Sequence, residues 1–180
     1  MPSAVARKDD LHHTQKGNKK SLIQNGEPYI RVRNKGEVYQ FLSTHRYSSD
    51  EVKQIRRKCG LSQKAFSEAM GMSVRTVQAW ERDINTPGGS SARLLDLVNY
   101  DYGFASMMDR ELVECDGEEV LQLRGRCGLP RELFALVIGV SNDAVASWEQ
   151  DRCKPNGAAS RLLDLLREDE EVLGLLMEKE

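Results

Sequence analysis

The sequence predicts an all-α protein built from two similar small helical units, and two observations carry this prediction. Apolar residues recur three or four positions apart along several short segments, as they do on one face of an α-helix. The segment 51–98 also aligns without a gap on 119–166, with 21 identities in 48 positions. Because this period of 68 residues is longer than those of solenoid repeats, it indicates two tandem domains rather than an array.

Composition narrows the class of protein. Of 180 residues, 39% are hydrophobic and 30% are charged, which is typical of a soluble globular chain. There is no apolar run of about 18 residues and no apolar signal segment, so we expect a cytoplasmic protein without membrane contact. The four cysteines show no C-x-x-C pairing, which favours reduced, mostly buried thiols over a zinc site. No nucleophile–base set or phosphate-binding loop is present, so we expect neither an enzyme nor a cofactor.

Charge is distributed unevenly along the chain. The net charge is −2, but residues 51–98 carry eight basic and five acidic side chains. Residues 119–166 carry six of each. An electrostatic partner such as DNA would therefore be sought in the first half.

Helix signals divide each repeat into four short helices. In the first repeat, Asp50 can cap a helix over "EVKQIRRKC", and Ser62 can cap a second helix that ends near a turn at Gly71. Ser73 can cap a third helix, and "SARLLDLV" starts a fourth after "NTPGG". A short helix, a glycine turn and a second helix form helix-turn-helix geometry, in which the second helix presents its N-terminal side chains to the major groove.

Three stretches carry a family resemblance. They are "IRRKCGLSQKAF", the "WE" at residues 80–81, and "PGGSSARLL". Together they resemble the lambda-repressor-like (XRE-type) helix-turn-helix family, and in particular its antitoxin branch of the HigA and MqsA kind. The second half repeats the pattern less faithfully. The resemblance implies two tandem helix-turn-helix domains and a sequence-specific DNA-binding regulator, a repressor of its own or a neighbouring promoter.

The resemblance also assigns roles to residues of the first repeat. It implies that the residues nearest the bases of double-stranded DNA are Val74, Arg75, Gln78 and Ala79. Nearer the phosphates it places Gln63, Lys64, Ser73 and Arg82. Arginine can pair with guanine and glutamine with adenine, while amide and cationic groups hold phosphates. The resemblance further implies structural ion pairs between Arg56 and Glu81 and, in the second repeat, between Arg124 and Glu149.

The second repeat differs at the positions that would read DNA. The residues there are Asn142, Asp143, Ala146 and Ser147, and Arg131 replaces Gln63. Arg131, Asn142 and Ser147 are therefore weaker candidates for DNA contact, since Asp143 would face phosphates.

The helix over "RELFALVIGV" is apolar nearly all round, which predicts burial on two sides. Its partner could be the first domain, the N-terminal region, a second chain or a toxin. An alternative function is therefore an antitoxin or inhibitor that binds a protein partner through this domain.

The domain boundaries follow from these segments. We expect a flexible basic tail over 1–26, a β-hairpin or an irregular lead over 27–49, and the DNA-reading domain over 50–104. An acidic connection over 105–118 leads to the second domain over 119–180, which serves interaction or dimerisation and ends in an amphipathic helix. A single reading helix covers only a half-site, so we expect a homodimer. The two tandem domains of one chain could instead mimic a dimer.

Overall fold

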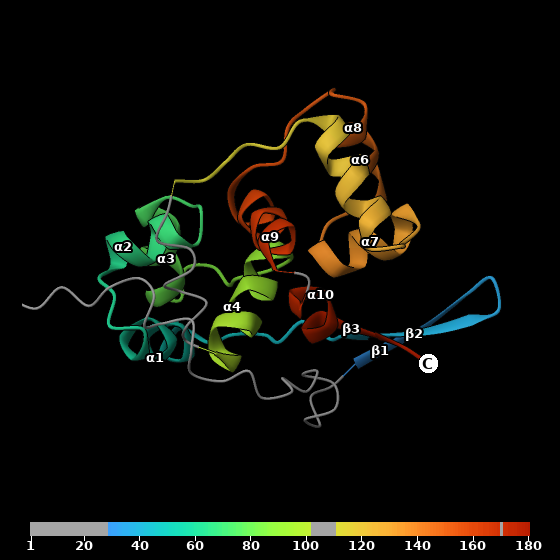
Figure 1. Ribbon diagram of the computed structural model, residues 1–180. Helices are drawn as coiled ribbons and strands as arrows, with labels where there is room; N and C mark the ends of the chain where they lie inside the picture. Colours follow the sequence, from blue (N-terminus) through green and yellow to red (C-terminus); the bar gives the residue numbers. More distant parts are fainter. Residues whose placement is uncertain (1–28, 102–110, 170) are drawn as a thin grey trace, which may run out of the picture.

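The computed structural model describes residues 29–101, 111–169 and 171–180. In these residues it contains nine helices and one three-stranded sheet, so the fold is mostly helical (Figure 1). The expected basic tail over 1–26 lies outside the described residues, as do residues 102–110 of the connecting region. None of the helices in the described part of the chain is long and apolar enough to span a membrane.

The first helical unit contains α1 (Ser49–Lys58), α2 (Gln63–Ala69), α3 (Val74–Glu81) and α4 (Ser90–Tyr100). Ser62 and Ser73 cap α2 and α3 as expected. The cap of α1 differs from the expectation, because it is Ser48 and not Asp50. Ser48 forms a capping box, in which its hydroxyl accepts from the backbone of Glu51 and its own N–H donates to the Glu51 carboxylate. Asp50 cannot make this reciprocal pair because the matching glutamate is three residues after Ser48.

The second helical unit contains α6 (Gly117–Arg126), α7 (Arg131–Ile138), α8 (Asn142–Glu149) and α9 (Gly157–Glu168). The helices α6, α7 and α8 begin 68 residues after α1, α2 and α3, the same offset as in the sequence alignment. Helices α1, α2 and α3 lie on one side of the pair formed by α4 and α9, and α6, α7 and α8 lie on the other (Figure 1). The repeated sequence thus gives a repeated order of helices.

A β-hairpin precedes the first helical unit. Of the two alternatives for residues 27–49, a hairpin or an irregular lead, the structure therefore shows the hairpin. Strand β1 (Tyr29–Asn34) pairs antiparallel with β2 (Glu37–Leu42) through a turn at Lys35 and Gly36. Both turn residues have positive φ, at 48° and 88°. Glycine adopts such a backbone without the steric cost of a Cβ, so the "NKG" stretch fits a tight hairpin turn.

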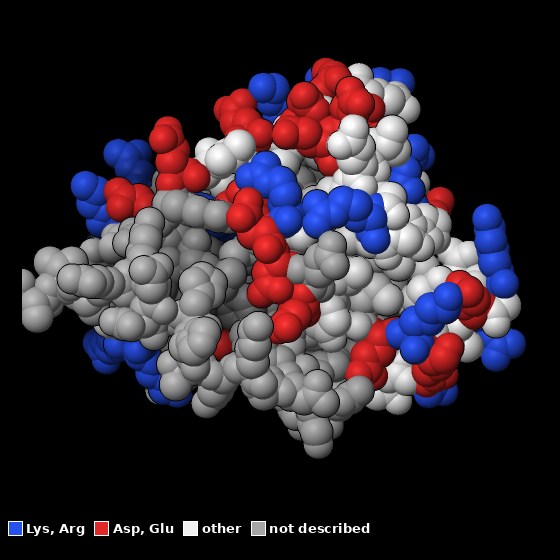
Figure 2. Space-filling view, in the orientation of Figure 1, with Lys and Arg blue, Asp and Glu red and all other residues white. Residues whose placement is uncertain are grey.

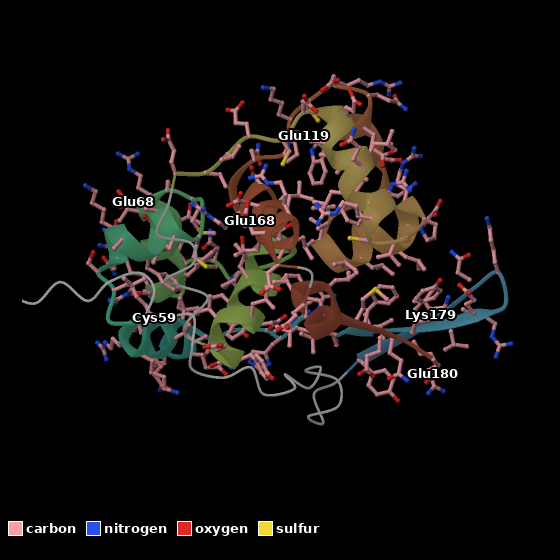
Figure 3. The ribbon with its side chains drawn as sticks, in the orientation of Figure 1. Cys59, Glu68, Glu119, Glu168, Lys179 and Glu180 are labelled. Carbon is pink, nitrogen blue, oxygen red and sulfur yellow. The ribbon has the colours of Figure 1, made fainter. Side chains whose placement is uncertain are left out.

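The C-terminal segment corrects the expectation of a single amphipathic helix. A short helix α10 (Glu171–Leu176) is followed by strand β3 (Met177–Lys179), which pairs antiparallel with β2. Lys179 and Glu180, labelled in Figure 3, form ion pairs with Glu37 and Arg31. The strand forms because β2 would otherwise leave one row of backbone groups unpaired, and Met177 is buried there. The inward positions Val172, Leu175 and Leu176 are buried as expected, and Leu173 is half-buried.

One buried cluster joins the sheet and both helical units. It includes Phe41 of β2, Val77 of α3 and Leu176 of α10. It also includes Leu133 and Val137, so most of the apolar face of α7 is covered within this chain. Ser90 and Arg93 of α4 donate to the carbonyl oxygens of Ile138 and Leu136, so the first unit is one partner of α7.

Candidate nucleic-acid interface

The turn between α2 and α3 fixes the angle between these two helices. Gly71 in this turn has φ of +69°. The backbone N–H of Met72 donates to the carbonyl of Ser67 at 2.9 Å and closes the end of α2. Ser73 then caps α3 by accepting from the backbone N–H of Thr76 at 3.2 Å. These contacts give the helix, turn and helix that the sequence predicts.

The inner face of α3 anchors it in the core. Val77 and Trp80 are buried three positions apart, and they lie in the same cluster as Phe66 and Met70 of the preceding segment. A helix whose buried residues recur at this spacing must turn its other face outward. The position of the outer face is therefore set by packing.

Arg75 lies on this outer face, at the second residue of α3. Its side chain is exposed and makes no hydrogen bond or ion pair within the described part of the chain. Ser73, Lys64 and Arg82 are exposed as well. The remaining expected base-contacting residues are half-buried, and these are Val74, Gln78 and Ala79.

Glu81 holds the far end of α3 through a buried polar network. Arg56 donates to it at 2.6 and 3.0 Å, and the amide nitrogen of Gln63 donates to it at 2.7 Å. Gln63 in turn accepts from the amide of Gln78 at 3.4 Å. The network joins α1, α2 and α3, and it places Gln63 between the structural ion pair and the outward side chain of Gln78.

The ionised form of Glu81 is favoured in this network. Burial raises the pKa of its carboxyl, but the hydrogen bonds from Arg56 and Gln63 outweigh burial and hold the pKa below its ordinary value. The Glu81 side chain is only 5% exposed. A buried carboxylate that accepts several charge-assisted hydrogen bonds is a rigid anchor for the elements that supply them.

The second helical unit repeats this network with different chemistry. Glu149 of α8 accepts from Arg124 at 2.5 Å and from Arg131 at 2.8 Å, so Arg131 takes the place of Gln63. Burial raises the pKa of Glu149, and the hydrogen bonds from the two arginines lower it further than burial raises it. Both expected ion pairs, Arg56 with Glu81 and Arg124 with Glu149, are present in the structure.

The outer face of α8 carries an acid in place of a base. Asn142 and Asp143 are exposed at the start of the helix, while Ser147 is half-buried. Asp143 suits the N-terminal turn of a helix because the helix dipole is positive there. In the face drawn in Figure 2, acidic side chains gather at the top, over α6 and α8. The second unit is therefore a poorer surface for a polyanion than the first.

Cysteines and metal-binding groups add no site in the described residues. Cys115 is buried, Cys59 and Cys127 are half-buried, and Cys153 is exposed, so the expectation of mostly buried thiols holds for one of the four. No described group of three His, Cys, Asp or Glu side chains could hold a metal ion.

Comparison with known proteins bears on the first unit. Residues 52–96 match the family described as Helix-turn-helix. This chain contains a helix-turn-helix domain. Over 61 residues the chain is 33% identical to Antitoxin HigA-2 of Vibrio cholerae serotype O1, a match that covers 34% of this chain and 59% of that protein.

A second relative matches a segment of similar length. Over 60 residues the chain is 40% identical to the uncharacterized HTH-type transcriptional regulator YiaG of Escherichia coli strain K12, covering 33% of this chain and 62% of that protein. The chain thus spans about three fifths of the length of these curated relatives. In the helix-turn-helix domain, α2 and α3 are the two helices that give the family its name, and Arg75 lies near the start of the second.

Two residues of functional interest were not singled out in the sequence. Arg93 of α4 and Arg161 of α9 are 3% and 2% exposed, inside the R-L-L-D-L runs. Each donates to a backbone carbonyl of the opposite helical unit. The sequence did hold a signal for their burial, because both copies of an otherwise apolar run begin with an arginine. An arginine that only faced solvent would have no need to be present in both copies.

Proposed function

We propose that the chain is a sequence-specific DNA-binding regulator that inserts α3 into the major groove. The observation that carries this proposal is the exposed Arg75 at the start of a helix that is otherwise anchored on its inner face and at its far end. The helix-turn-helix match over residues 52–96 supports the same function. A rigid helix with a cationic side chain in its N-terminal turn is suited to reading base edges.

The side chains of α2 and α3 divide into two roles. Arg75 pairs with a guanine through two hydrogen bonds, and Gln78 pairs with an adenine. Lys64, Ser73 and Arg82 contact phosphates and set the register of the helix on the duplex. Gln63, which accepts from the amide of Gln78, orients that side chain and joins the phosphate contacts. Val74 and Ala79 complete the base-facing surface with apolar contacts.

The second helical unit is a degenerate copy of the same domain in this proposal. Its helix order and its Arg124–Glu149 pair support that assignment, and its acidic outer face accounts for its weaker part in DNA reading. The regulator acts as a repressor of its own or a neighbouring promoter, because a protein bound in the major groove at a promoter blocks polymerase access.

The deciding experiment compares duplexes at fixed salt. Duplexes from the region upstream of the gene, or selected from a random pool, are titrated against scrambled duplexes of equal length and composition. We expect a preference of about a thousandfold or more for the specific site. Equal affinity for all duplexes, with equal salt dependence, would identify a nonspecific nucleic-acid binder and reject the proposal.

A repressor role has its own test. A reporter placed behind the specific site should be silenced when the chain is expressed, and Arg75→Ala should restore expression. Arg57→Ala, an exposed change on α1, serves as the matched control. Silencing that survives Arg75→Ala would place the repressor contact elsewhere.

A second candidate function is that of an antitoxin, which the similarity to Antitoxin HigA-2 favours. In that case the chain would bind a toxin as well as DNA. Co-expression with the protein encoded next to it, followed by purification under high salt, should then give a stable complex of defined stoichiometry. A chain that purifies alone and regulates a reporter without that neighbour contradicts this candidate.

A further inference from the structure

The two helical units contact each other through equivalent residues. Arg93 donates to the carbonyl oxygen of Leu136 at 3.3 Å. Arg161 donates to the carbonyl oxygen of Glu68 at 3.4 Å. The two donors are 68 residues apart, and so are the two acceptors. The contact from the first unit to the second is thus repeated from the second unit to the first.

The glycines of the two turns show the same exchange. A Cβ on Gly71 would lie 2.8 Å from the carbonyl oxygen of Gly157. A Cβ on Gly139 would lie 2.7 Å from the carbonyl carbon of Gly89, where Gly139 and Gly89 are the repeat equivalents of Gly71 and Gly157. Backbones approach this closely only where both partners lack side chains. Two equivalent pairs of residues that contact each other in this reciprocal way define an isologous interface.

The helices α4 and α9 lie at the centre of this interface (Figure 1). They are equivalent elements of the two units, so an approximate twofold axis passes between them. Figure 3 labels Glu68 on α2 and Glu119 on α6, which lie on opposite sides of this helix pair. Arg93 and Arg161 are buried here, and removing the opposite unit would take away their hydrogen bonds to the carbonyl oxygens of Leu136 and Glu68. The two units therefore form one body.

We propose that one chain is an intramolecular counterpart of a dimer, which covers two adjacent half-sites of DNA as a monomer and reads bases mainly with α3. This inference rests on the proposed function. The approximate twofold relates α3 to α8, as the symmetry of a dimer relates its two reading helices on a duplex. The side chains of Arg75 and Asn142 stay exposed on both helices, outside the contacts between the units. The second unit occupies the place that a second copy of the chain would take.

The two half-sites are read unequally. Where the first unit has Arg75 and Lys64, the second has Asp143 and Glu132. An acid near phosphates weakens binding, and Ala146 offers no hydrogen bond where Gln78 does. The recognition sequence is therefore asymmetric, with base preference on one side and a flanking segment that is covered with little preference.

The first test measures mass without DNA. Light scattering at micromolar concentration should give 20.3 kDa, the mass of one chain. A mass of two chains overturns the proposal. This measurement does not depend on DNA, so it separates the inference from the proposed function, which fails instead if no duplex is preferred over its scrambled control.

The second test uses the preferred duplex. We expect one chain per duplex, a selected motif without a palindrome, and a footprint that extends about one helical turn beyond the preferred bases. Two chains per duplex on a palindromic motif would overturn the inference while leaving the proposed function intact.

The third test asks whether α8 meets DNA. Asp143→Arg gives the second unit the charge found at Arg75, and it should tighten binding roughly tenfold at low salt and steepen the salt dependence. Glu171→Arg makes the same charge change on α10 and should leave the affinity nearly unchanged. If Asp143→Arg has no larger effect than Glu171→Arg, α8 does not lie on the duplex and the two-half-site claim is rejected.

Discussion

Arg56 and Glu81 form a two-point ion pair, with Nε to Oε1 at 2.6 Å and Nη2 to Oε2 at 3.0 Å. Arg56 also donates to the carbonyl oxygen of Leu61 at 3.0 Å, so it joins α1, the segment before α2, and the end of α3. The pair ties the C-terminal end of α3 to α1. Because both side chains are largely buried, the pair acts on the position of α3.

Removing the carboxylate should destabilise the domain. Glu81→Ala leaves Arg56 buried without its counter-charge, at an expected cost of about 3 kcal/mol, the lower end of the range for buried pairs, because the Arg56 side chain is partly exposed. Denaturant unfolding at neutral pH measures the loss. Glu68→Ala, an exposed change on α2, should cost less than about 0.5 kcal/mol.

Acid should weaken the protein through the same carboxylates. The pKa values of Glu81 and Glu149 are lowered in the folded state, so the unfolded chain binds protons more readily. Their contribution is fully present well above about pH 4.3 and is lost as the pH falls from there through the lower folded pKa values. Unfolding curves between pH 7 and pH 3 should show this. A Glu81→Gln variant should lose stability at pH 7 and show a shallower pH dependence, whereas an unchanged slope would assign the acid sensitivity to other groups.

The base-reading assignment predicts unequal effects of substitutions. Arg75→Ala and Gln78→Ala should each cost roughly 1–3 kcal/mol of specific binding and relax preference at one base pair. Lys64→Ala should weaken all sequences alike and reduce the salt slope by about one. Asn142→Ala should do less than either of the first two. If Asn142→Ala abolishes preference while Arg75→Ala leaves it intact, the reading helix belongs to the second unit.

Two glycines offer a matched pair of substitutions. Gly60 and Gly71 have nearly the same φ, at +70° and +69°, but a Cβ on Gly60 meets nothing within 4 Å. Gly60→Ala should therefore cost only the left-handed strain, about 1–2 kcal/mol. Gly71→Ala should cost a further 1 kcal/mol or more, on the order of the penalty for overpacking, because its Cβ would press on Gly157. Equal losses in thermal or denaturant unfolding would show that the close approach between the two units carries no energy.

Local signals in the sequence were enough to predict that the helices of the first unit form. Ser62 and Ser73 cap their helices because a serine before an apolar-periodic segment needs only its near neighbours to act. The predicted cap Asp50 is wrong because Ser48, Ser49 and Asp50 are all good caps, and only the reach of Glu51 back to Ser48 decides between them. The ion pairs were also found, since the resemblance placed both partners.

Contacts between residues far apart in the chain could not be predicted from the sequence. The strand at Met177 has no alternating pattern of its own, and it forms because β2 offers an open edge far away in the chain. For the same reason the contact of Arg131 with Glu149 on the neighbouring helix could not be predicted from the local sequence. The contacts of Arg93 and Arg161 depend on how the two units are placed relative to each other. The local periodicity of the sequence carries no information on that placement.

The pairing of β2 with β3 has a consequence for the order of events during synthesis. The hairpin leaves the ribosome before the helical units, and its partner strand β3 follows only after both units have been translated. Until then the open edge of β2 can pair with the same edge of a neighbouring nascent chain, as unpaired strand edges do. Nascent chains lie close together on a polysome, so slow translation of the helical units would lengthen the time for which the edge of β2 is open to such pairing.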